Sequence, residues 1–137
     1  MWKATVLTLF PEMFPGTLGH SLAGKALDAG MWSLKKVNIR DFSSDKNGKV
    51  DDVPFGGGYG MVIKADVLNE ALKSVSDAPG PRIYLSPRGK KFDQQLAKKL
   101  SLGNGAVFIC GRYEGVDERF LVYNEIEEVS VGDFILS

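Results

Sequence analysis

The sequence predicts an α/β fold, with a mostly parallel sheet and helices on both of its faces. Two observations lead to this prediction: apolar, strand-like runs alternate with helix-like segments, and no internal repeat or linker interrupts them. The chain has 137 residues, of which 44% are hydrophobic and 25% are charged. This length and composition fit one globular domain that covers residues 1–137.

The first half of the chain contains two predicted strands and two predicted helices. Residues 2–10 are rich in apolar and β-branched side chains and predict a strand. Apolar side chains at helical spacing predict a helix over 17–29, and alternation of apolar and polar side chains predicts a strand over 34–42. The polar, glycine-containing stretch 43–60 predicts a loop, and 64–76 has the clearest amphipathic helix pattern.

The second half repeats this alternation with shorter elements. Residues 81–86 predict a strand, residues 87–92 predict a turn, and Asp93 is placed to cap the next helix. The remaining predicted elements are a strand at 106–110, helical turns at 116–123, and short strands at 126–130 and 134–136.

Charge, cysteine content and hydropathy exclude several protein classes. Seventeen basic residues balance seventeen acidic ones, so no global field attracts the chain to nucleic acid, and RNA would have to bind local patches. The single cysteine, Cys110, excludes an internal disulfide and a cysteine-based zinc site, and we expect no metal centre. No apolar run approaches the roughly 20 residues of a membrane span, and the N-terminus lacks signal-peptide features, so we expect a cytoplasmic protein.

Three loops are the candidate ligand-binding segments. Residues 86–91, 111–117 and 131–134 each combine glycine with polar side chains directly after an apolar strand. Ligands of open α/β sheets bind outside the carboxyl ends of the strands, so these loops predict a composite pocket. The familiar nucleotide motifs GxGxxG and GxxxxGK[ST] are absent, and the glycine-rich run 55–61 is better explained as a flexible or substrate-ordered loop.

Other polar residues have ordinary explanations. His20, the only histidine, is better explained as solvated or capping than as part of a triad with Ser21. Asp51 and Asp52 are adjacent carboxylates in a polar loop and are usually solvated there. The lysine pairs 35–36, 90–91 and 98–99, together with Arg88 and Arg112, could be solvated or could contact phosphates; composition leaves both open.

Five segments together resemble a known family. They read LFPEMF, RDF…VDDVPFGGGYGM, IYLSPRGKKFDQ, CGRYEGVDER and VGDFILS, in this order along the whole chain. The sequence is in this respect similar to the bacterial tRNA (guanine-N1-)-methyltransferases of the SPOUT superfamily, whose α/β domain contains a deep trefoil knot. The resemblance implies that the chain is the N-terminal, cofactor-binding domain, and that residues beyond Ser137 complete the knot.

The resemblance also implies an activity. Members transfer a methyl group from S-adenosyl-L-methionine to N1 of the guanosine 3′-adjacent to the tRNA anticodon, and Mg²⁺ stays open as a further requirement. They are homodimers with a site at the subunit interface, where the apolar side chains of Phe10, Met13 and Phe14 are expected to pack. No catalytic residue is expected in this chain, because the base and the base-positioning arginine are expected beyond Ser137.

Carried over residue by residue, the resemblance implies that the cofactor contacts three segments of the chain, 84–87, 111–115 and 131–136. The carboxylate of Glu114 is expected to meet its cationic amino-acid end. A non-catalytic α/β module that binds RNA or a protein partner is the alternative function. The expected cofactor-binding residues are Tyr84, Leu85, Ser86, Pro87, Gly111, Tyr113, Glu114, Gly115, Val131, Gly132, Asp133, Phe134, Ile135 and Leu136.

Overall fold

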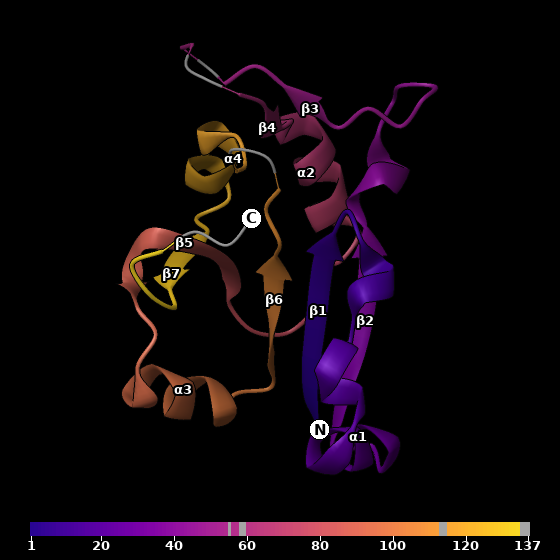
Figure 1. Ribbon diagram of the computed structural model, residues 1–137, viewed down its shortest axis with the longest axis vertical. Helices are drawn as coiled ribbons and strands as arrows, with labels where there is room; N and C mark the ends of the chain where they lie inside the picture. Colours follow the sequence, from indigo (N-terminus) through magenta and orange to yellow (C-terminus); the bar gives the residue numbers. More distant parts are fainter. Residues whose placement is uncertain (55, 58–59, 113–114, 135–137) are drawn as a thin grey trace.

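A five-stranded parallel sheet forms the centre of the protein. The computed structural model describes residues 1–54, 56–57, 60–112 and 115–134. The strands follow the order β2-β1-β6-β5-β7, and each neighbouring pair is parallel (Figure 1). This arrangement confirms the predicted fold class. The strands are β1 (Trp2–Thr8), β2 (Trp32–Asn38), β5 (Arg82–Lys91), β6 (Gly105–Ile109) and β7 (Glu127–Ser130).

Helices cover both faces of the sheet. Alternate residues of β6 point to opposite faces, so Val107 packs with the helices α2 and α4, whereas Ala106 packs on the side of α3. The first face holds the larger core, with Phe120 of α4 fully buried. The helices of the structure are α1 (Ser21–Asp28), α2 (Ala65–Lys73), α3 (Gln94–Ser101) and α4 (Glu118–Tyr123), with 3-10 turns η1 (Pro11–Met13), η2 (Gly16–Gly19) and η3 (Ile39–Phe42).

Several helix ends follow directly from the sequence. The Asp93 carboxylate accepts a hydrogen bond of 2.9 Å from the backbone N–H of Leu96, which confirms the predicted cap of α3. The helix predicted over 17–29 is shorter, because Ser21 has a positive φ of 56° that separates η2 from α1. Such a backbone angle cannot be recognised from apolar spacing.

Four predicted elements in the sheet region differ from the structure. The strand predicted over 34–42 ends at Asn38, because Ile39 turns into η3 and is fully buried there. The stretch 43–60 is not entirely loop, since β3 (Asp51–Asp52) pairs antiparallel with β4 (Val62–Ile63). The turn predicted over 87–92 is largely strand, since β5 continues to Lys91. Of the strand predicted over 134–136, Phe134 is not in a strand, and 135–136 lie outside the described residues.

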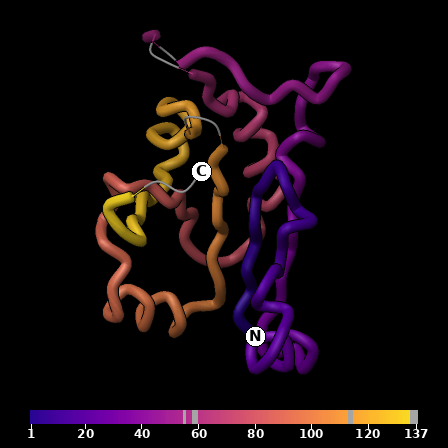
Figure 2. Tube along the Cα trace, viewed as in Figure 1, coloured from indigo at the N-terminus to yellow at the C-terminus, as the bar shows by residue number. Residues whose placement is uncertain are grey.

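Strand β5 curves around β7. Val129 of β7 is aligned with both Leu85 and Lys90 of β5, so the intervening residues bend past β7. In the bend, Gly89 lies so close to β7 that a Cβ atom there would be 2.4 Å from the carbonyl carbon of Glu128. Figures 1 and 2 show the curved β5 with β7 inside the bend. The trefoil knot itself stays a prediction.

Candidate functional site

The three candidate loops lie together at one edge of the sheet. The second and third follow β6 and β7, whereas the first, 86–91, was wrongly predicted as a loop and lies in the bend of β5. The strands β5, β6 and β7 are neighbours in the sheet and all run in the same direction. The carboxyl ends of these strands therefore meet, as the position of ligand sites in open α/β sheets requires. The end of β1 joins them, because the Arg112 guanidinium lies 5.6 Å from the centre of the Phe10 ring.

Tyr84 connects the first loop to the second. A Cβ atom on Gly111 would lie 2.9 Å from a ring carbon of Tyr84, and one on Gly115 would lie 2.8 Å from its hydroxyl oxygen. Gly115 also has a φ of 118°, which disfavours any side chain. Tyr84 therefore leaves little room for a side chain at either glycine, whether or not a ligand is bound nearby. Burial raises the pKa of Tyr84, although a backbone hydrogen bond from Val116 acts in the opposite direction.

The third loop is folded on itself after β7. The Ser130 hydroxyl donates to the carbonyl of Gly132 at 2.9 Å and accepts from its N–H at 3.2 Å. The ring of Phe134 lies against the Cα of Gly132, where a Cβ atom would be 2.1 Å from the ring. Three apolar side chains remain about half exposed at this edge: Leu85 (51%), Val131 (58%) and Phe134 (52%).

Strand β4 brings the 51–63 segment against the second loop. The N–H of Ile63 donates to the carbonyl of Gly115 at 3.0 Å, and the N–H of Asp117 donates to the carbonyl of Ile63 at 3.1 Å. Asp52, in β3, is exposed and accepts from the N–H of Val53. This pairing was not predicted, because two-residue strands have no usable periodicity.

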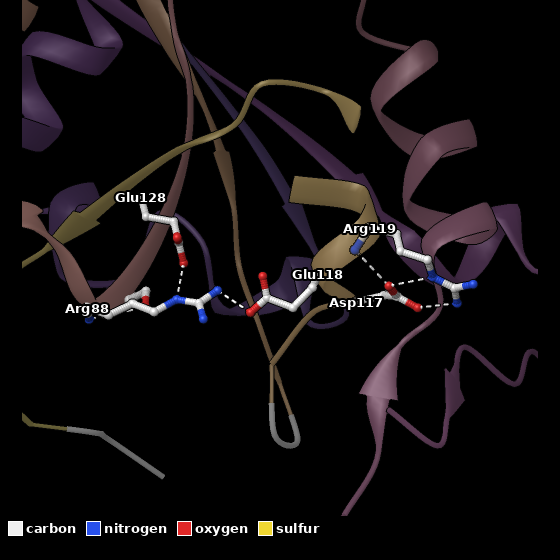
Figure 3. Close-up of polar contacts among 6 residues, drawn as sticks. Arg88, Asp117, Glu118, Arg119 and Glu128 are labelled. Carbon is white, nitrogen blue, oxygen red and sulfur yellow. Dashed lines mark hydrogen bonds and ion pairs between the residues drawn. The ribbon is translucent and has the colours of Figure 1, made fainter. Parts of the chain in front are cut away.

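An ion pair begins α4. The Asp117 carboxylate accepts from the backbone N–H of Arg119 at 2.9 Å and from its guanidinium at 3.0 and 2.7 Å (Figure 3). The hydrogen bonds from Arg119 lower the pKa of Asp117, whose side chain is only 4% exposed. A carboxylate with a lowered pKa is a weak base, so Asp117 is poorly suited to remove a proton from guanine.

A second cluster of charges joins all three loops. Arg88, in the bend of β5, donates to Glu128 of β7 at 2.8 Å and also contacts Glu118 of α4 (Figure 3). These hydrogen bonds raise the pKa of Arg88, with the one to Glu128 as the largest cause. The sequence predicts a solvated or phosphate-binding Arg88, because its partners Glu118 and Glu128 lie 30 and 40 residues away and produce no local pattern.

The remaining predicted residues have clear positions or lie outside the described residues. Ser86 and Pro87 are in the bend of β5, and Asp133 is exposed after β7. Burial raises the pKa of the Cys110 thiol to about 11, which fits the expected inert cysteine. His20 is exposed at the start of α1 and makes no side-chain cap. The expected residues outside the described part are Tyr113, Glu114, Ile135 and Leu136.

Two surface concavities of the described residues lie away from these loops. One, of about 570 Å³, is between α2 and α4 and includes Asn69 and Tyr123. Another, of about 380 Å³, is apolar and lies between Trp2, Phe108 and α3. At the candidate site itself, Leu85, Val131 and Phe134 provide exposed apolar surface. No helix in the described part of the chain is long and apolar enough to cross a membrane.

These features define a class of protein: an α/β domain with a parallel sheet, in which polar and glycine-containing segments meet at the edge where ligands of such sheets bind. A family model described as tRNA (Guanine-1)-methyltransferase TrmD matches residues 2–137. The chain belongs to this family.

Curated relatives agree with the family match. A tRNA (guanine-N(1)-)-methyltransferase of Mesorhizobium japonicum is 58% identical over 99% of the chain and 60% of the relative. Proteins of the same name from Rhizobium etli and Rhodospirillum rubrum are 56% and 52% identical, over 99% and 98% of the chain and 59% and 56% of the relative. The chain thus spans less than two thirds of the length of these relatives.

Proposed function

We propose that this chain forms the S-adenosyl-L-methionine-binding part of a tRNA (guanine-N1-)-methyltransferase. The observation that supports the proposal most directly is the meeting of three glycine-bearing segments in a chain of this family: the bend of β5 and the loops after β6 and β7. The reaction is methyl transfer to N1 of the guanosine 3′-adjacent to the anticodon, in the cytoplasm.

The described residues suit such a cofactor. Adenine needs an apolar surface bordered by backbone donors and acceptors. Leu85, Val131 and Phe134 offer exposed apolar surface, and the loops around Gly111 and Gly132 offer backbone groups. When bound, the cofactor supplies an electrophilic methyl group, and the role of these side chains is to hold and orient it.

Asp117, the carboxylate at the end of the second loop, is poorly suited to remove the guanine proton. Asp117 is held by Arg119, and hydrogen bonding lowers its pKa. We therefore propose that proton removal and guanine positioning are performed by other parts of the whole protein. Its tRNA and a second copy of the chain are the proposed partners. Phe10 and Met13, exposed beyond β1, are available to such a copy.

Calorimetric titration with S-adenosyl-homocysteine tests the cofactor site. We expect saturable binding, and Leu85→Ser should weaken it about tenfold, because the lost apolar contact is worth roughly 1.5 kcal/mol. Leu102→Ser is the matched control, since Leu102 is exposed just after α3, away from the loops. A wild-type chain that is folded but gives no binding heat would refute the proposal and favour a non-catalytic module that binds RNA or a protein partner.

A further inference from the structure

Arg88 joins two carboxylates that come from different elements of the fold. Its Nε donates to Glu128 in β7 at 2.8 Å, and its Nη2 contacts Glu118 at the start of α4. Figure 3 shows the guanidinium lying between the two acids. Three elements that are far apart in the sequence are therefore connected through one side chain.

Each of these elements leads directly into or out of one candidate loop. Arg88 itself follows Ser86 and Pro87 in the bend of β5. Glu118 is the first residue of α4, immediately after the second loop, and Glu128 lies two residues before the end of β7, which precedes the third loop. A displacement of any one loop would stretch a contact of Arg88.

The chemistry of the cluster depends on arginine. A planar guanidinium presents several N–H donors in fixed directions and can serve two carboxylates at once, whereas a lysine ammonium acts as a compact point charge. Without the cation, Glu118 and Glu128 would face each other as two like charges. Arg88 and Glu118 are more than half exposed, so the cluster should add little to global stability.

We propose that Arg88 is a positioning residue that holds the three loops of the cofactor site in register. In this proposal the cluster acts through the backbone of the segments that it connects, and not by contact with the cofactor. This proposal rests on the proposed cofactor site, but its structural part, the mutual placement of the loops, can be measured without any cofactor.

The test compares Arg88→Gln, Arg88→Lys and the control Lys99→Gln, which removes one exposed positive charge from α3. Amide hydrogen exchange is followed in peptides covering 111–117 and 131–134, with β1 and β6 as references. Arg88→Gln should accelerate exchange in both loops about tenfold while β1 and β6 keep their protection. The exchange rates of Arg88→Lys should lie between those of the wild type and Arg88→Gln, and Lys99→Gln should exchange at the rates of the wild type.

Binding of S-adenosyl-homocysteine gives the second readout. Arg88→Gln should weaken binding about tenfold, and addition of about 0.5 M salt should weaken wild-type binding more than that of the variant, because it screens the cluster. Unchanged exchange in the loops of Arg88→Gln would overturn the proposal, whatever happens to binding. If the wild type binds no cofactor, the proposed function fails, while the exchange result still decides the role of Arg88. If Arg88→Gln unfolds, Glu128→Gln replaces it under the same criteria.

Discussion

Replacing Gly89 with alanine should separate β5 from β7. An added Cβ would lie 2.4, 2.5 and 2.6 Å from three backbone atoms of Glu128 and Val129, all of them in β7. Non-bonded carbon atoms prefer about 3.5–4.0 Å, so the strands would have to part by about 1 Å. No flexible side-chain end is available to move aside, because every atom in the way belongs to the backbone.

The expected cost has two parts. Overpacking in a well-packed region costs about 1–3 kcal/mol. Separation of the strands also strains the hydrogen bond of 2.7 Å from the N–H of Phe92 to the carbonyl of Ser130, worth about 1 kcal/mol. We expect Gly89→Ala to lower the free energy of unfolding by about 2–4 kcal/mol, which corresponds to roughly 8–16 °C in Tm for a domain of this size.

Urea unfolding followed by circular dichroism measures this change. The matched control is Gly103→Ala: an added Cβ at this glycine meets only the Leu100 carbonyl oxygen, at 3.5 Å, and the glycine has no positive φ. The control should stay within about 0.5 kcal/mol of wild type. Equal stability of the two variants would refute the close contact between the β5 bend and β7.

Three further substitutions test other contacts. Burial raises the pKa of Cys110 to about 11 in the folded protein, whereas the thiol of an unfolded chain has a pKa near 8.5. Between these two values the unfolded state loses the proton first, so the free energy of unfolding should fall by up to about 1.4 kcal/mol per pH unit. Cys110→Ala should remove this pH dependence, as measured by thermal unfolding. The pKa of Asp117 is lowered, so its contribution is present above about pH 4 and is lost as the pH falls toward the folded pKa. Asp117→Asn should lower the free energy of unfolding by about 1–2 kcal/mol at neutral pH, and its stability should depend less on pH in the acidic range, as measured by urea unfolding. If the variant loses stability at low pH as steeply as the wild type, the ion pair of Asp117 with Arg119 does not cause the dependence. The Arg82 guanidinium donates to four backbone carbonyls, those of Val75, Ser76, Ala78 and Gly80. Arg82→Lys keeps the positive charge but not the planar set of donors, so it should lower the free energy of unfolding by about 1–3 kcal/mol in denaturant. An unchanged free energy of unfolding would show that these carbonyls find other donors.

The parallel sheet and most of its helices could be predicted because their signals are local. Asp93 caps α3 as expected, and α2 lies within the predicted helix over 64–76. The positions of the loops after β6 and β7 followed from a general rule of α/β sheets together with the order of apolar runs, whereas the loop predicted over 86–91 is part of β5.

The errors arose where contacts distant in sequence decide the backbone. Pro87 and Gly89 are typical turn residues, yet pairing with β7 keeps Lys90 and Lys91 in strand β5. The alternation of apolar and polar side chains around Ile39 is typical of a strand with one exposed face. In the structure Ile39 is instead fully buried at the start of η3. The charged cluster of Arg88 was missed for the same reason, because its partners are defined only when the sheet has formed.

The bend of β5 around β7 also sets an order of events for the growing chain. Arg88 is synthesised 40 residues before Glu128, so the segment that curves around β7 leaves the ribosome before the strand with which it pairs. Strand β7 must then enter a space enclosed by chain already made, and contacts between such distant residues form slowly. Until it enters, the backbone of Gly89 and the edge of β5 remain open to unrelated strands. A nascent chain of this protein therefore has its greatest need of protection in the interval between the synthesis of β5 and the arrival of β7.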